Sequence, residues 1–307
     1  PHAEHNAIKE SRTNLEGSSL YVSLEPCSNY GKKNSCTEEI INKKINKVFF
    51  SINDPDIRSF NKSFAILKNK GIAVNRGVNS SEVNYFYRSY IKSKKNILPF
   101  ITCKIAISKD FFTVNKKDRN ITNNFSRGRV HLMRSNHDCI MTSSNTIIED
   151  NPQLTCRIDG LKKTSPSRIL LDRKLRTPLN AKIFKESKIY PTIIFYNYAK
   201  KEKIRKIKKF NVKLFKIPLA EDGYFNLKEV LTKANELGFF RILVESGVKL
   251  TTSFLNSNLV DDLKLFISSK NLGKNGKLSI KKFMNLSLKK KKCVYEKVNL
   301  LGDTLIS

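Results

Sequence analysis

The sequence has few acidic residues, no long apolar run and no cysteine pattern typical of a disulfide framework. It contains 27 Asp and Glu residues against 58 Lys and Arg residues, for a formal net charge of +31. No stretch reaches the roughly 18 apolar residues that cross a bilayer, and no signal-peptide pattern opens the chain. We therefore expect a cytoplasmic protein with reduced thiols. No internal repeat is visible, which argues against a solenoid.

The excess of positive charge has two possible interpretations, a nucleic-acid-binding surface or a solvated Lys-rich surface. Lys and Arg neutralise phosphates, so the charge could indicate nucleic-acid binding. A dedicated binding surface would concentrate its charge on one segment, whereas Lys is spread here through the whole chain. The distribution therefore favours a solvated Lys-rich surface that attracts small anionic substrates in general, and it makes a nucleic-acid partner the less favoured reading.

The length and the apolar pattern predict two α/β domains. A chain of 307 residues is long for one domain. The polar stretch 92–99 ends in a proline and separates a first domain, 1–95, from a second, 99–307. In the first, strands are expected at 20–24, 48–52 and 72–74, and helices at 3–10, 36–44, 61–69 and 81–95. Alternation of strands and helices indicates a parallel or mixed sheet.

The second domain carries further apolar runs of strand length. They are typical of strands buried on both faces of a sheet. Helical segments lie between most of them, and the Lys run 289–292 is predicted to be a solvated turn or strand edge. The expected strands are 100–107, 139–141, 167–171, 192–196, 241–244 and 263–267.

Three residues near the start of the chain have the composition of a catalytic zinc site. His2, Cys27 and Cys36 supply one imidazole and two thiolates, and three protein ligands leave a fourth position to water. Zinc lowers the pKa of bound water to about 7. Glu4, two residues after His2, is predicted to move protons without binding the metal. His-x-Glu followed by Pro-Cys is the pattern of zinc base deaminases, so we expect one Zn²⁺ per chain.

The local sequence supports this assignment. Ser35 and Glu38 form a capping-box pair that predicts a helix starting at Cys36, where the helix dipole favours a thiolate. His5 is a possible alternative ligand, but it would leave the helix at a different angle and is expected at the surface. Cys103 and Cys139 lie in apolar runs and are expected in the core.

The deaminase motifs resemble those of a known family. His-Ala-Glu at 2–4, Leu-Glu-Pro-Cys at 24–27 and Asn-Asp-Pro at 53–55 are similar to the deaminase half of the bifunctional riboflavin-biosynthesis deaminase/reductases. The eight residues between the cysteines, with Gly-Lys at 31–32, favour that family over nucleic-acid deaminases. The resemblance implies a cytidine-deaminase-like three-layer domain. Because about fifty residues usually precede the first motif and residue 1 is Pro, we expect a domain shortened by its first helix and strands.

The second half extends the resemblance through residues 99–307. Similar segments are 99–110, 146–157, 170–178, 243–247 and 259–262. The resemblance implies a dihydrofolate-reductase-like α/β domain that uses NADPH, a homodimer formed through that domain, and phosphorylated pyrimidine substrates. The expected sequence of reactions is hydrolytic deamination of a diaminopyrimidinone ribosyl phosphate, followed by reduction of the ribosyl group to a ribityl chain.

The resemblance also assigns roles to residues of the second half. NADPH contacts are expected from three separate residues and from one continuous stretch at a strand end, where a helix N-terminus offers backbone N–H groups to phosphate. Substrate contacts are expected from two arginines suited to the ribose phosphate, one leucine and one glutamate. The cofactor residues are Ala106, Thr146, Asp150, Gly247, Val248, Lys249, Leu250, Thr251, Thr252 and Ser253, and the substrate residues are Arg134, Leu154, Arg157 and Glu245.

The chain departs from the family pattern at several positions. The family has His at 29, two prolines at 34–35, glycines near 61 and 63, Gly at 111, Trp at 120, Ser at 173 and Gly at 246. This chain has instead Asn29, Asn34, Ser35, Asn61, Ser63, Phe111, Asn120, Arg173 and Ser246.

Two alternatives remain open on the sequence alone. One is a nucleic-acid base deaminase with a basic RNA-binding second domain, which would use the same zinc ligands and account for the charge. The other is a reductase whose deaminase half is vestigial. Zinc content and NADPH oxidation separate these possibilities.

Overall fold

The computed structural model describes residues 2–28, 35–95, 98–118, 120–281, 293–298 and 302–307. The chain divides into two compact units, Pro1–Ile97 and Leu98–Ser307. Positions 29, 31–32 and 34, and the predicted turn at 289–292, lie outside the described residues. None of the described helices has the length and apolar character that a bilayer crossing requires.

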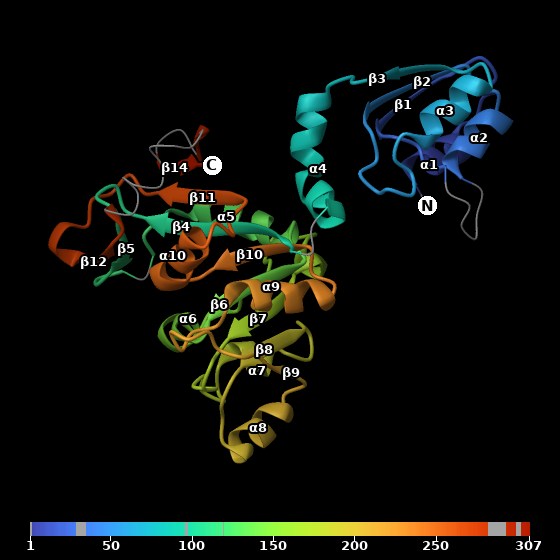
Figure 1. Cartoon of the computed structure of the whole chain (residues 1–307). Helices are drawn as coiled ribbons and strands as arrows, with labels where there is room; N and C mark the ends of the chain where they lie inside the picture. Colours follow the sequence, from blue (N-terminus) through green and yellow to red (C-terminus); the bar gives the residue numbers. More distant parts are fainter. Residues whose placement is uncertain (1, 29–34, 96–97, 119, 282–292, 299–301) are drawn as a thin grey trace. The chain divides into compact units, whose positions relative to one another are not determined.

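The first unit is a three-stranded parallel sheet with helices (Figure 1). The strand order is β1-β2-β3, and both pairings are parallel, as the alternation of strands and helices predicted. In chain order the elements are α1 (Ala3–Glu10), β1 (Ser19–Leu24), α2 (Cys36–Asn42), β2 (Lys47–Ile52), α3 (Lys62–Asn69), β3 (Ala73–Arg76) and α4 (Ser80–Lys95).

One face of this sheet forms the core of the unit. Val48 and Phe50 of β2 are fully buried there against Ile40 of α2 and Leu67 of α3. On the opposite face, the hydroxyl of Ser23 lies 2.9 Å from that of Tyr87 on α4. The first unit therefore has helices on both faces of its sheet, as the predicted fold class requires.

A buried carboxylate organises the loop that follows β2. Glu25 accepts hydrogen bonds from the backbone N–H groups of Asp54, Asn61 and Ser63, and from the Ser63 hydroxyl, at 2.9–3.3 Å. Asn61 has φ +57°, a left-handed conformation that Asn tolerates in place of Gly. The loop thus keeps its path without the family's glycines.

The second unit is built on a nine-stranded mixed sheet (Figure 1). The order is β13-β14-β11-β4-β10-β6-β7-β8-β9, and all strands from β11 to β9 are parallel. In chain order the elements are β4 (Phe100–Ile107), β5 (Phe112–Asn115), α5 (Asn124–Ser135), β6 (Cys139–Ser143), α6 (Ser144–Asp150), η1 (Lys162–Thr164), β7 (Ser167–Leu171), α7 (Lys182–Lys185), β8 (Thr192–Tyr196), α8 (Lys201–Lys208), β9 (Lys213–Lys216), α9 (Leu227–Glu236), β10 (Arg241–Glu245), α10 (Val248–Asn256), β11 (Asp262–Ile267), η2 (Gly273–Asn275), β12 (Gly276–Ser279), β13 (Tyr295–Lys297) and β14 (Thr304–Ile306).

Each face of the large sheet has its own core. Cys103, Cys139 and Val244 pack with α9 and α10 on one face, whereas Ile140 and Leu243 pack with α6, α7 and α8 on the other. Every predicted strand of this unit is present. The antiparallel pair of β5 and β12 was not predicted, since these strands pair across about 160 residues of sequence. Because the seven strands are parallel, their carboxyl ends meet at one edge, where ligands bind in such sheets.

We expect removal of the Glu25 carboxylate to destabilise the first unit. Glu25→Ala leaves backbone donors of Asp54, Asn61 and Ser63 without an acceptor, which should lower the free energy of unfolding by about 2–3 kcal/mol. Native-state hydrogen exchange measures this change. Glu16→Ala is the matched control, because Glu16 is more than half exposed in its ion pair with a lysine and should cost less than about 0.5 kcal/mol. Equal losses in the two variants would contradict the prediction.

Candidate functional sites

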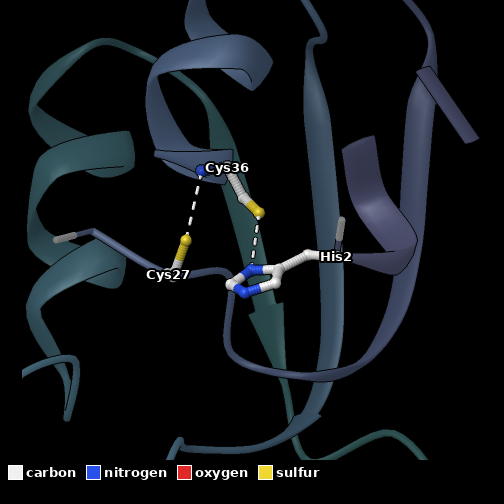
Figure 2. A group of neighbouring side chains, drawn as sticks. All are labelled: His2, Cys27 and Cys36. Atoms are coloured by element: carbon white, nitrogen blue, oxygen red, sulfur yellow. Dashed lines mark hydrogen bonds between the residues drawn. The ribbon is translucent and has the colours of Figure 1, made fainter. Parts of the chain in front are cut away.

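The structure brings together the three predicted metal ligands (Figure 2). His2 precedes α1, Cys27 follows β1, and Cys36 is the first residue of α2. Their ligand atoms all lie within 4.8 Å of one another. Cys36 Sγ is 3.3 Å from His2 Nδ1, and the Cys36 backbone N–H donates to Cys27 Sγ at 3.3 Å. Residues 34 positions apart in the chain thus share one small site.

Local hydrogen bonds hold the two cysteines in place. The Ser35 hydroxyl accepts from the Glu38 N–H while the Glu38 carboxylate accepts from the Ser35 N–H, which is the predicted capping box. Thr37 donates its N–H and its hydroxyl to the Cys27 carbonyl, at 3.1 and 2.9 Å. The start of α2 is therefore hydrogen-bonded to the loop after β1, and this contact holds the two sulfur atoms close to each other.

The two cysteine thiols influence each other's pKa in opposite directions. A hydrogen bond from Cys36 lowers the pKa of the Cys27 thiol to about 5. The same hydrogen bond raises the pKa of Cys36, because a second thiolate beside the first is unfavourable. Such a pair binds a soft divalent cation, which takes up both sulfurs as thiolates and releases protons.

The donor set fits zinc. Zn–S and Zn–N bonds of about 2.3 and 2.0–2.1 Å in a tetrahedron place ligand atoms roughly 3.3–3.8 Å apart. The distance of 3.3 Å between Cys36 Sγ and His2 Nδ1 lies in that range, and all three ligand atoms are within 4.8 Å of one another. Within the described ranges, no other group of three or more His, Cys, Asp or Glu residues has this proximity. His5, the alternative ligand, instead pairs with Glu39 at 2.6 Å. Three ligands leave one position open.

Glu4 lies beside this group, on the first turn of α1. It is 8% exposed although it carries a carboxylate. Burial raises its pKa, His2 opposes that rise, and the charge of Cys27 adds to it. A carboxyl group with a raised pKa, beside the three candidate ligands but outside their set, is suited to accept and return a proton.

Several of the predicted residues of the second unit lie at or just after the carboxyl ends of the parallel strands. Ala106 is near the end of β4, Thr146 and Asp150 are in α6 after β6, and Glu245 ends β10. Strands β4, β10 and β6 are neighbours in that order. The sheet therefore gathers residues separated by up to 139 positions in sequence at one edge.

The start of α10 directs backbone N–H groups to this edge, and no side chain in the described part of the chain caps them. Its N-cap, Gly247, has no side chain, and no side-chain hydrogen bond caps the helix. Further along α10 the hydroxyls of Thr252 and Ser253 are directed back to carbonyls of the same helix. The N–H groups nearest Gly247 are thus the ones suited to phosphate.

Hydroxyl groups join the starts of α6 and α10. Ser246, where the family has Gly, donates to the Ser143 hydroxyl at 3.1 Å, and its oxygen lies 3.3 Å from that of Thr146. Thr146 also lies 3.2 Å from Ser143. The added side chain is accommodated in a polar cluster and leaves the backbone turn in place.

Arg134 and Glu245 form a bidentate ion pair. Arg134 donates to the two carboxylate oxygens at 2.9 and 2.6 Å, and to the Thr155 carbonyl at 3.0 Å. The two side chains are only 10% and 15% exposed. Arg134, predicted to bind the substrate phosphate, therefore uses at least three of its five donors within the protein, and each carboxylate oxygen of Glu245 retains a lone pair.

The charge of Glu245 is compensated by its surroundings. Burial alone would raise the pKa of Glu245, but Arg134 and the nearby Lys104 lower it to about 2. Lys104 is paired with Glu245 in the register of β4 and β10. Burial lowers the pKa of Lys104, and Glu245 opposes that effect. Lys104 was not predicted as a site residue, although a lone charge inside an apolar strand was a visible signal.

His131 is a second site residue that the sequence did not reveal. Its Nδ1 lies 3.0 Å from the Thr155 carbonyl and receives the backbone N–H of Arg157 at 3.2 Å. Burial, followed by the charges of Arg134 and Arg157, lowers its pKa. His131 therefore joins α5 to the loop that carries the predicted substrate residues.

That loop presents one predicted residue to solvent and buries another. The Arg157 side chain is exposed and donates to the Gln153 side chain at 3.1 Å. Leu154 is 2% exposed and has φ +56°. Arg157 is thus the predicted arginine that is open to a phosphate, whereas Leu154 lies inside the loop.

Two further departures from the family pattern are Asn120 and Phe111. Asn120, where the family has Trp, lines a cavity of about 510 Å³ with Asn123, Ser268 and Asp303. Phe111, where the family has Gly, adopts φ +69°. The turn is therefore retained with a bulky residue in a strained conformation.

Arg173, at the family's Ser position, is anchored to a neighbouring turn. Its guanidinium donates to the Gly223 carbonyl and lies 4.6 Å from the centre of the Tyr224 ring. The larger side chain is therefore held by contacts within the unit.

Two family models match the chain. The RibD C-terminal domain matches residues 99–298, and the zinc-binding region of cytidine and deoxycytidylate deaminases matches residues 1–52. The first match covers nearly all of the second unit. It sets aside the alternative of an RNA-binding second domain.

Known proteins are similar over the whole chain. The riboflavin biosynthesis protein RibD of Aquifex aeolicus is 34% identical over 314 residues, covering 100% of this chain and 84% of that protein. RibD of Bacillus amyloliquefaciens is 31% identical, covering 87% and 71%. A crystal structure of the deaminase/reductase of Thermotoga maritima matches with a TM-score of 0.83 and 28% identity, covering 100% and 84%.

We expect Arg134→Met to destabilise the second unit strongly. It leaves the Glu245 carboxylate buried without its partner, which should lower the free energy of unfolding by about 3–5 kcal/mol in urea denaturation. The double variant Arg134→Met/Glu245→Leu removes both charges and should recover most of that loss. A double variant no more stable than the single one would contradict the prediction.

The same pair gives a pH dependence with a defined sign. The folded pKa of Glu245, about 2, lies below the unfolded value of about 4.3. Its contribution to stability is therefore complete above about pH 4.3 and declines as the pH falls toward 2. Glu245→Gln should show a flatter stability profile over that window than the unmodified protein.

Proposed function

Because the chain belongs to the RibD family of bifunctional riboflavin-biosynthesis deaminase/reductases, we propose that its first unit holds one Zn²⁺ and its second binds NADPH. The deaminase substrate is then 2,5-diamino-6-(5-phosphoribosylamino)pyrimidin-4-one. The reductase substrate is 5-amino-6-(5-phosphoribosylamino)uracil. The observation that carries the deaminase assignment is the proximity of one imidazole and two sulfurs within 4.8 Å, with a buried carboxyl beside them.

In the deaminase site, the protein residues position a metal and move a proton. His2, Cys27 and Cys36 hold zinc, which acts as a Lewis acid toward water and substrate when bound. Glu4 takes a proton from the attacking water and passes it to the departing amino group, so that ammonia leaves as a neutral molecule. The raised pKa of Glu4 supports this exchange, because the carboxyl must hold the proton between the two steps.

In the reductase site, the parallel edge orients two ligands. NADPH supplies the hydride when bound. The uncapped start of α10 receives its phosphates, and Thr146 and Ser246 contribute hydroxyls beside it. Arg157 binds the ribose phosphate of the substrate, and Glu245 accepts a hydrogen bond from the sugar while Arg134 and Lys104 offset its charge.

The deaminase proposal is tested by separating metal binding from proton transfer. Glu4→Gln should keep about one zinc per chain in elemental analysis and lose roughly 10²–10⁴-fold in ammonia release, the range expected for an acid–base residue. Cys27→Ala should lose both the zinc and the activity. A chain that binds no zinc would favour the vestigial-deaminase alternative, whereas full activity of Glu4→Gln would remove Glu4 from the mechanism.

The cofactor proposal is tested by a charge at the start of α10. Lys249→Glu places a carboxylate in the first turn, where phosphate is expected, and should weaken NADPH binding about tenfold in a fluorescence titration. Lys208→Glu makes the same change of charge in the last turn of α8 and should leave the Kd within about twofold, since screening limits distant charges. Equal weakening in both variants would indicate a general charge effect and count against this location.

A further inference from the structure

A buried arginine anchors the loop that carries the predicted substrate residues. Arg168 on β7 is 0% exposed. Its guanidinium donates to the carbonyls of Gln153, Ile183 and Tyr190 at 2.9–3.0 Å, and to the Thr192 hydroxyl at 2.7 Å. One buried side chain therefore links the loop at Gln153 to α7 and to the residues that follow α7. Arg168 lies near the amino end of β7, away from the carboxyl edge of the sheet where ligands are expected.

Glu186 balances this buried charge. Its Oε2 lies 3.6 Å from Arg168 Nη1 and has no hydrogen-bond partner among the residues that the structure describes. Burial lowers the pKa of Arg168 to about 10, and Glu186 opposes that effect. A buried cation with a nearby carboxylate is costly to disturb, so the position of Glu186 is fixed by Arg168.

Gln153 connects this anchor to the exposed Arg157. Its side-chain amide donates to Glu186 Oε1 at 2.7 Å and accepts from Arg157 Nη1 at 3.1 Å. Gln153 is the sole glutamine of the sequence. A side-chain amide has both a donor and an acceptor, whereas a carboxylate lacks the donor and an ammonium lacks the acceptor. Glutamine at position 153 can therefore donate to the Glu186 carboxylate and accept from the Arg157 guanidinium at the same time.

The backbone of the loop needs such support. Asn151 and Leu154 have φ +43° and +56°, values in the left-handed region. Conformations of this kind persist where the surroundings hold them. Arg168 holds the carbonyl before Leu154, and Arg134 holds the carbonyl after it, at Thr155. The backbone on either side of Leu154 is thus held by a buried arginine, while the side chain of Arg157 remains exposed.

We propose that Gln153 is a positioning residue that holds the Arg157 guanidinium ready for the substrate phosphate. The inference rests on the proposed contact between Arg157 and that phosphate. A long exposed side chain loses rotamer freedom when it binds, and a side chain held in advance loses less. The phosphate is remote from the carbon that is reduced, so the effect belongs in KM and leaves kcat nearly unchanged.

A double-mutant cycle on the full chain tests this role. The variants are Gln153→Met, which keeps the length of the side chain and removes its polar atoms, Arg157→Ala, and the two combined. NADPH oxidation is followed with the phosphorylated uracil substrate. Gln153→Met should raise KM about fivefold with kcat within about twofold, and should raise it no further in the Arg157→Ala background. With the dephosphorylated substrate, Gln153→Met and the unmodified protein should give the same KM.

The control is Lys185→Met, which removes an exposed cation of α7 outside this network and should leave KM unchanged. If Arg157→Ala raises KM but Gln153→Met does not, or if Gln153→Met raises it equally in both backgrounds, the positioning role is wrong and the phosphate contact stands. If Arg157→Ala leaves KM unchanged, the phosphate contact itself fails, and the role of Gln153 fails with it.

Discussion

The buried ion pair between Arg134 and Glu245 is the contact on which the arrangement of the second unit depends. It joins α5 to the carboxyl end of β10, and through the Thr155 carbonyl it also holds the loop after α6. A buried carboxylate without this partner would be strongly disfavoured, so the three segments are held together as one structure. The same pair places a fixed negative charge next to Lys104, at the edge proposed to hold the reductase substrate.

The first unit relies on hydrogen bonds to organise its site. Glu25 collects backbone donors from the loop after β2, while Thr37 fastens the Cys27 loop to the start of α2. These contacts pre-form the two-sulfur side of the metal site before any ion is present, and His2 completes it from the start of α1. Preorganisation of this kind leaves the metal little rearrangement to impose on the protein.

The residues that depart from the family pattern are accommodated by local backbone conformation and by local hydrogen bonds. The family has glycine at position 111 and near position 61. In this chain Asn61 and Phe111 adopt left-handed backbone conformations. Asn does so at low cost, whereas Phe does so with strain. Ser246 fills its position by joining the hydroxyls of neighbouring helix starts. Each of these side chains is therefore accommodated by its backbone conformation or by hydrogen bonds to its neighbours.

The sequence by itself determined the main parallel strands of both units, the capping box at Ser35, and the imidazole and two thiols of the candidate metal site, since each depends on patterns of polarity and residue type. The tertiary structure decided the surroundings of the predicted substrate residues: Arg134 pairs with Glu245, Arg157 faces solvent, and Lys104 lies opposite Glu245. These outcomes depend on which strands lie side by side and on how deeply each side chain is buried. Such contacts join segments more than one hundred residues apart, and no local pattern encodes them.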